Sequence, residues 1–188
     1  FLINLPVQVS LDELNNTLRS KVRGKSLSID ENLKLIVKEI NLSALGEKIL
    51  VKVDFKADKN SFLQEAKGVL YLWGNIFYDQ ASNYLKVVEL DYDVDTKNAL
   101  ILTADLLLKP ILLRQIEERL SFPLDQQLSR AKDEANGYIR KIKLPPEIDA
   151  NIVVKTIKVQ KVVVTNNDIY LVLLADGNMS AILNIGEY

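Results

Sequence analysis

One hydrophobic stripe in the second half of the sequence constrains the fold more than any other feature. Between residues 102 and 142, hydrophobic side chains recur mostly at every third or fourth position, with charged residues between them. This spacing places the hydrophobic side chains on one face of an α-helix. Pro110 is suited to the first turn of such a helix, whereas Pro123 falls in its interior. Since the stripe keeps its phase across Pro123, the sequence predicts one long helix over residues 111–142 with a kink at this proline.

A helix of that length would be longer than a compact globule built from the same chain. At about 1.5 Å per residue it would span about 48 Å. A compact chain of 188 residues has a diameter of about 40 Å. The sequence therefore predicts an elongated molecule in which a sheet covers the helix along its length.

The first part of the chain contains a well-marked short helix followed by strands. Ser10 and Glu13 have the spacing of a capping box, which predicts a helix start, and Gly24 is expected to end that helix. Residues 26–58 are typical of strands, because hydrophobic and polar side chains largely alternate with a period of two. The alternation changes phase at Lys38–Glu39, which predicts a β-bulge.

The last part of the chain is rich in β-forming residues after Pro145–Pro146. Two polar segments, at 166–168 and 176–178, indicate hairpin turns that divide it into three strands. The sequence has no alternation of strands with helices and no phosphate-binding loop. An antiparallel α+β fold follows, in a single domain over residues 1–188. Because the chain begins at Phe1 rather than Met, we expect it to be a fragment of a longer protein.

The composition removes most catalytic and metal-binding chemistries. The chain has no Cys and no His, so it lacks a thiolate nucleophile, a zinc–thiolate site and the commonest general base. Its formal net charge of −1 argues against a nucleic-acid binder, which normally has a basic excess. No hydrophobic run reaches the ~18 residues that a helix needs to span a bilayer.

Two acidic clusters remain as candidates for chemistry, and neither has a suitable pattern. The D-x-D-x-D segment at 91–95 has the spacing that begins an EF-hand calcium loop, but that loop then requires Gly and Glu where this sequence has Thr96 and Leu102. Glu117 and Glu118 are neighbours, which point about 100° apart on a helix and are poorly placed to act on one bond. We therefore expect no enzymatic activity, no cofactor and no metal site.

Two features leave alternatives open about what the surface contacts. Residues 68–79 form a strand that is hydrophobic on both faces, which indicates either core or dimer packing or a lipid-contacting surface. Basic residues between 140 and 161 are typical of a solvated face, with a membrane-surface patch as the alternative.

The middle of the chain carries a family resemblance. Its motifs are Gly68-Val-Leu-Tyr-Leu-Trp-Gly74, Tyr78-Asp79 and Leu85-Lys-Val-Val-Glu-Leu-Asp-Tyr-Asp-Val-Asp-Thr96, and the closing Ala181-Ile-Leu-Asn-Ile185 also fits. The chain resembles the C-terminal half of an uncharacterised bacterial family, a domain of unknown function. Many relatives have an aromatic residue where this chain has Asp105 and Leu106. The family is similar to tubular lipid-binding (TULIP) modules, related to bactericidal/permeability-increasing protein, in which a strongly curved antiparallel sheet wraps around one long helix.

The resemblance implies binding, or transport, of lipid or another hydrophobic ligand in the bacterial cell envelope, where the protein would be periplasmic or lipid-anchored. The ligand would lie in a groove between the long helix and the sheet and gain about 0.8 kcal/mol per buried methylene. We expect the groove to be lined by Tyr71, Trp73, Phe77, Leu113, Ile116, Leu120 and Leu128. The alternative is a non-catalytic structural or protein-interaction module with a filled core. The expected partners are a hydrophobic small molecule, a membrane surface or the remainder of a longer chain, and not nucleic acid.

Overall fold

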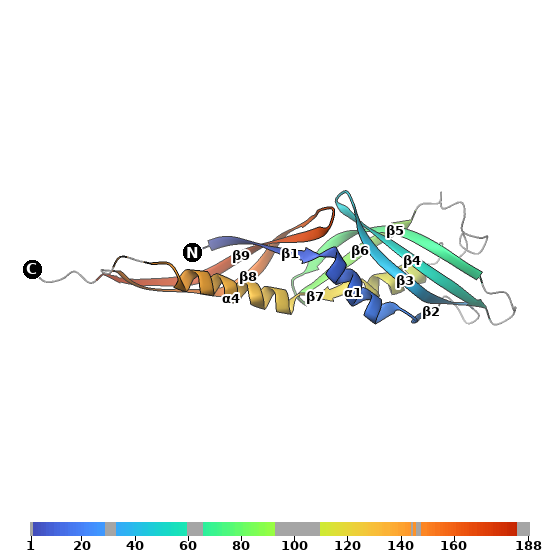
Figure 1. Ribbon diagram of the computed structural model, residues 1–188, viewed down its shortest axis with the longest axis horizontal. Coiled ribbons are helices and arrows are strands. Elements are labelled where there is room, and N and C mark those ends of the chain that lie inside the picture. The colour runs from blue at the N-terminus through green and yellow to red at the C-terminus, as the bar shows by residue number, and fades with distance from the viewer. Residues whose placement is uncertain are drawn as a thin grey trace, which may run out of the picture.

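Two antiparallel sheets lie one after the other along the long axis of the molecule (Figure 1). The computed structural model describes residues 2–28, 33–59, 66–92, 110–143, 145 and 148–183. One sheet has six strands in the order β2-β3-β4-β5-β6-β7, and the other has three in the order β1-β9-β8. The strands are β1 (Leu2–Ser10), β2 (Ser26–Ser28), β3 (Leu33–Leu45), β4 (Lys48–Lys59), β5 (Ala66–Asp79), β6 (Tyr84–Tyr92), β7 (Ser121–Pro123), β8 (Ile148–Val164) and β9 (Asp168–Leu183). The helices are α1 (Leu11–Val22), α3 (Pro110–Arg119) and α4 (Asp125–Arg140).

Helix α1 begins and ends where the sequence predicts. Ser10 Oγ accepts a hydrogen bond from the Asp12 backbone N–H at 3.2 Å, which satisfies one of the free donors of the first turn. Gly24 follows the helix with a φ of +77°, a conformation that suits glycine because it has no Cβ. The hydrophobic stripe of the helix is buried, and consists of Leu11, Leu14, Leu18 and Val22.

The six-stranded sheet also follows the sequence pattern closely. The register of β3 against β4 shifts between Val37 and Glu39, so the predicted β-bulge is confirmed. A turn at Gly46, whose φ is +62°, joins the two strands. The inward-facing side chains of β4 are almost completely buried, and they are Ile49, Val51, Val53 and Phe55. Helices α1 and α3 pack their hydrophobic residues into the same core.

The prediction of a single long kinked helix over residues 111–142 is wrong. The chain forms two short helices, α3 and α4, with strand β7 between them. Proline in a helix interior has no N–H to donate and clashes with the carbonyl four residues earlier, at a cost of about 3 kcal/mol or more. The residue before a proline also prefers an extended backbone. Residues 121–123 therefore pair with β6, opposite Tyr84, Leu85 and Lys86, and Phe122 enters the core with only 2% exposure.

The fold class is corrected accordingly. We expected one sheet around one long helix. The residues that the structure describes instead form two antiparallel sheets with short helices packed against them. Each helix buries hydrophobic residues of its own, Leu112 and Ile116 in α3 and Ala131 and Ala135 in α4, so the hydrophobic spacing does not require one continuous helix. The molecule is elongated as predicted, but its length comes from two successive sheets (Figure 1).

The three-stranded sheet is dominated by the long β8–β9 hairpin. The turn predicted at 166–168 is confirmed, with the Thr165 N–H donating to the Asp168 carbonyl at 2.8 Å. The prediction of a turn at 176–178 is wrong, because β9 continues through this segment and Gly177 pairs with Val154. Continuous pairing with β8, and with β1 as far as Asp176, supplies backbone partners that a local turn would lose. Helix α4 packs on this sheet, and Ala135, Val154 and Ala175 form a small buried cluster there.

No helix in the described ranges combines the length and the hydrophobicity needed to cross a bilayer.

Candidate functional site

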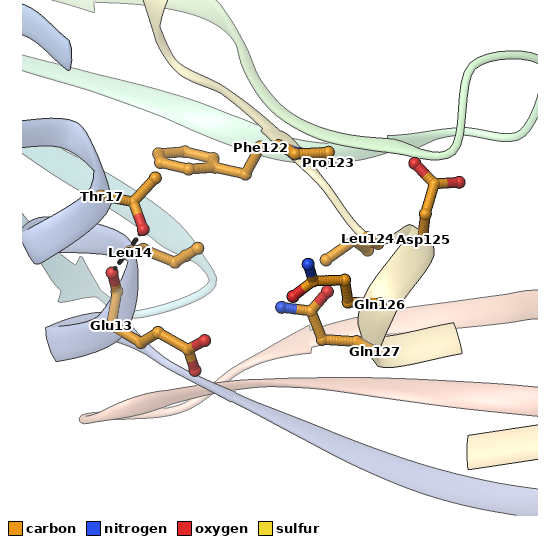
Figure 2. A pocket seen from close by; sticks show the side chains of 9 residues that line it. All are labelled: Glu13, Leu14, Thr17, Phe122, Pro123, Leu124, Asp125, Gln126 and Gln127. Atoms are coloured by element: carbon orange, nitrogen blue, oxygen red, sulfur yellow. Dashed lines mark hydrogen bonds between the residues drawn. The ribbon is translucent and has the colours of Figure 1, made fainter. Parts of the chain in front are cut away.

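A surface pocket lies where the two sheets meet, between α1 and the first turn of α4 (Figure 2). Its volume is about 370 Å³, which is at the lower end of the range for small-molecule sites. Helix α1 contributes one wall and the segment from β7 into α4 contributes the other. The residues that line it are Glu13, Leu14, Thr17, Phe122, Pro123, Leu124, Asp125, Gln126 and Gln127.

The pocket has a hydrophobic floor and a polar rim. Leu14, Phe122 and Leu124 are each no more than 5% exposed and belong to the core. Figure 2 shows the Gln126 and Gln127 side chains facing Leu14 and Phe122 across the gap. The Oε1 atom of Gln127 is buried and has no hydrogen-bond partner among the described residues. An unpaired buried acceptor is costly, so a ligand that donates an N–H or O–H to it would relieve this cost.

The α4 side of the pocket is held by a hydrogen-bonded network from the β5–β6 turn. Asn83 adopts a positive φ of 57°, and its backbone carbonyl accepts from the Leu124 N–H at 2.9 Å. Its Nδ2 donates to Asp125 Oδ1 at 3.1 Å, and its Oδ1 accepts from the Tyr78 hydroxyl at 2.8 Å. Burial and the nearby carboxylates of Asp125 and Asp79 raise the pKa of Tyr78, so its hydroxyl stays protonated and can donate. The network fixes the start of α4 relative to β6.

The same turn contains an ion pair. Lys86 Nζ donates to Asp79 Oδ2 at 2.6 Å, and the Ser82 hydroxyl donates to the same oxygen at 2.7 Å. These hydrogen bonds hold the pKa of Asp79 below its usual range. Ala81 N–H donates to the other oxygen at 3.0 Å, which is the pattern of an Asx turn. A charged, structurally satisfied carboxylate of this kind stabilises the turn.

None of the residues predicted to line a lipid groove lines the pocket of Figure 2. Ile116 and Leu120 are buried in the core, and Leu113 and Leu128 pack against it. The other three lie on the outward face of β5, where Tyr71 and Phe77 are 40% and 52% exposed and Trp73 is half-buried. The long helix beside which the groove was expected is absent from residues 110–143.

The acidic residues considered as candidates for chemistry lie in different elements, Glu117 in α3 and Asp91 in β6. Glu117 Oε1 accepts from the Leu90 backbone N–H at 2.8 Å, so this carboxylate satisfies a donor of β6. Asp91 ends up near the end of β6, while residues 93 and 95 lie outside the described residues. Within the described ranges, no cluster of three or more acidic residues has the geometry of a metal site.

A second surface stands out at the end of the three-stranded sheet, far from the six-stranded one (Figure 1). We call it the ribbon end and define it as residues 137–143, 148–155 and 176–183. Large hydrophobic side chains are exposed there, and they are Tyr138 (72%), Ile142 (55%), Val153 (44%), Met179 (63%) and Ile182 (64%). A depression of about 550 Å³ on this surface is lined by residues of β8 and β9, among them Val153, Lys155 and Met179.

The sequence indicated only part of these two sites, because the basic residues between 140 and 161 include Arg140, Lys141, Lys143 and Lys155 of the ribbon end. Gln127 has no distinguishing sequence context, because an amide at the start of a helix is usually solvated. The ribbon end combines residues from three segments, and the sequence pattern did not single out its exposed hydrophobic residues. The exposure of Met179 depends on where α4 ends over the sheet, because Met179 lies on the face of β9 that α4 covers.

The fold and these surfaces define an elongated antiparallel α+β domain with a small pocket and an exposed hydrophobic end. The family model described as "Domain of unknown function (DUF4403)" matches residues 1–183, and the chain belongs to this family. The expected membership of a domain-of-unknown-function family is thereby confirmed, while the tubular lipid-binding architecture is not. No curated protein matches this chain.

Proposed function

We propose that this domain is a non-catalytic interaction module that binds its partner through the ribbon end. The single observation that carries the proposal is the concentration of exposed large hydrophobic side chains in this part of the molecule. Among the described residues, eleven such side chains are exposed, and five of them lie at the ribbon end: Tyr138, Ile142, Val153, Met179 and Ile182. Gathered hydrophobic exposure is typical of an interaction site, whereas scattered single residues are not.

The packing of the six-stranded sheet supports the same proposal. Its inner face is covered by α1 and α3, and the side chains that they contribute are nearly inaccessible: Leu18 and Leu112 are 0% exposed, and Ile116 is 2% exposed. Each fully buried side chain of this size contributes about 1.5–3 kcal/mol to stability. If a ligand entered this core and displaced these side chains, the protein would lose their contribution to its stability. Binding through the surface needs no such rearrangement.

Photo-crosslinking tests the proposal directly. A benzoylphenylalanine at position 182 is expected to give a defined adduct in cells that produce the protein, because Ile182 is 64% exposed at the ribbon end. The same group at Leu45, which is 49% exposed at the β3–β4 turn, is the matched control. Absence of an adduct at 182, or equal adducts at both positions, would contradict the proposed function.

A second candidate function is supported by the pocket of Figure 2. Its hydrophobic floor and the unpaired Gln127 Oε1 fit a small amphiphile that carries a hydrogen-bond donor. Native mass spectrometry of the purified protein is expected to show a bound small molecule that is lost in Thr17→Trp, in which the larger side chain fills the pocket. If both forms have the mass of the bare chain, this candidate is wrong.

A location in the bacterial cell envelope rests on the resemblance alone and is part of the proposal. Fractionation of cells that produce the full protein, with the adduct at position 182 followed in each fraction, tests it. Recovery only with cytoplasmic markers would contradict it.

A further inference from the structure

We infer that the partner of the ribbon end is an anionic lipid surface, an assignment that rests on the proposed function and names its partner. Three observations on the described residues support it. Hydrophobic side chains are exposed on both faces of the β8–β9 hairpin, basic residues surround them, and the whole group lies at one extremity of an elongated molecule (Figure 1).

The two-faced exposure follows from the strand register. Directly paired residues of neighbouring strands share a face, and successive residues alternate between faces. Met179 pairs with Ile152, which is on the same face as Val154, and Val154 is buried against α4. Ile182 pairs with Asp149, which places it on the opposite face.

A folded protein surface would cover one of these faces and leave the other in water. A lipid interface surrounds whatever enters it, so it can receive both faces at once, together with the end of α4. Tyr138 and Ile142 extend the hydrophobic surface from that helix end, with exposures of 72% and 55%. Tyrosine is also suited to this environment, because its ring is hydrophobic and its hydroxyl can remain hydrated.

The charge of the ribbon end is opposite to that of an anionic bilayer. Its basic residues are Arg140, Lys141, Lys143 and Lys155, and its acidic residues are Asp149 and Asp176, all six of them exposed. Four positive and two negative charges leave a local charge of +2, whereas the whole chain has −1. Lys141 Nζ lies 5.8 Å from the centre of the Tyr138 ring, so a cation and a hydrophobic side chain are adjacent. Adjacent basic and hydrophobic groups are the combination that attracts a protein to anionic headgroups.

Vesicle sedimentation tests the inference with the intact 188-residue chain. The protein is expected to bind vesicles of phosphatidylcholine mixed with phosphatidylglycerol at least about tenfold more tightly than vesicles of phosphatidylcholine alone. Added salt should reduce this difference, because it screens exposed charges. A Trp73→Phe, Ile182→Trp variant places the only tryptophan at the ribbon end, and its emission should shift to shorter wavelength on the mixed vesicles.

Two variants with matched controls locate the binding surface. Met179→Asp combined with Ile182→Asp should weaken binding to the mixed vesicles by about tenfold or more, and both positions are exposed, so the fold should be retained. Its control is Phe77→Asp, because Phe77 is 52% exposed on the other sheet. Lys141→Glu combined with Lys143→Glu should abolish the preference for phosphatidylglycerol.

The control for the charge variant is Lys48→Glu, which alters an exposed lysine at the β3–β4 turn. If either control loses as much binding as its matched variant, the surface is wrongly assigned. If neither kind of vesicle is bound, the lipid inference is overturned. The interaction function itself still stands in that case if position 182 crosslinks to a protein, or if the chain self-associates and Met179→Asp with Ile182→Asp prevents this. Failure of the vesicle assay together with absence of any adduct overturns both.

Discussion

Asn15 is the polar residue whose replacement tests the account of the fold most sharply. It lies on α1, is only 6% exposed, and forms two hydrogen bonds with the backbone of Leu42 in β3. Its Nδ2 donates to the Leu42 carbonyl at 2.9 Å, and its Oδ1 accepts from the Leu42 N–H at 2.6 Å. Strand β2 pairs with β3 only as far as Ile36, so the side chain takes the place of a neighbouring strand further along this edge.

The magnitude follows from the two groups that lose their partner. Asn15→Leu keeps a side chain of similar size but leaves a buried donor and a buried acceptor of Leu42 unpaired. Each unpaired group costs about 1–3 kcal/mol. Because water can partly hydrate the exposed edge of β3, we expect the free energy of unfolding to fall by about 3 kcal/mol. For a chain of this size, that loss corresponds to a decrease of about 6–12 °C in Tm.

Urea unfolding followed by circular dichroism measures the effect. Asn16→Leu is the control, because Asn16 is the next residue of the same helix and is exposed. The control should change stability by no more than about 0.5 kcal/mol. If Asn15→Leu is as stable as the control, the hydrogen bonds to Leu42 do not hold α1 on the sheet edge and the reasoning is refuted.

Four further predictions concern β5, α4, β7 and the turn between β5 and β6. Gly74→Ala should destabilise the protein by about 1–3 kcal/mol, because the new Cβ would lie 2.8 Å from the Val88 carbonyl oxygen. Gly137→Ala should stabilise the protein by about 0.5–1 kcal/mol, since nothing lies within 4 Å of a Cβ added at this helical position. Thermal melts in which Gly74→Ala is more stable than Gly137→Ala would contradict both predictions. Phe122→Ala should cost about 3–5 kcal/mol in urea unfolding, and a loss below about 1 kcal/mol would show that β7 does not anchor the core. Asp79→Asn should lower stability at neutral pH but not under acidic conditions. The pKa of Asp79 is lower in the folded than in the unfolded protein. The carboxylate therefore stabilises the fold above its unfolded-state pKa, and this contribution is lost as the pH falls through its folded-state pKa. A stability difference that persists unchanged in acid would refute this role of the Lys86 contact.

Local features of the sequence predicted local structure correctly. The Ser10 cap and the Gly24 stop bound α1, and the change of phase at Lys38–Glu39 marks a real bulge. These features succeed because the atoms that decide them lie within a few residues along the chain. The antiparallel strands follow for the same reason, from short segments in which hydrophobic and polar residues alternate.

The candidate sites were harder to predict because they combine distant segments. The pocket needs α1 beside the first turn of α4, more than a hundred positions apart, and the ribbon end needs three separate segments. Of the residues proposed for a lipid groove, Leu113, Ile116, Leu120 and Leu128 belong to the core or pack against it, whereas Tyr71, Trp73 and Phe77 lie on β5.

The sequence by itself determined the short helix α1 and the strands β3 to β5 of the six-stranded sheet. Only the tertiary structure decided what happens around Pro123 and Gly177. Helix and turn propensities there amount to a few kcal/mol, and a neighbouring strand can outweigh them. The free edge of β6 pairs with residues 121–123 and turns an expected kink into a strand. Likewise, β8 pairs with β9 through the expected turn and extends it, while β1 pairs with β9 as far as Asp176. A backbone donor or acceptor is satisfied by whichever partner the whole fold brings to it, and that partner is not encoded in the neighbouring residues.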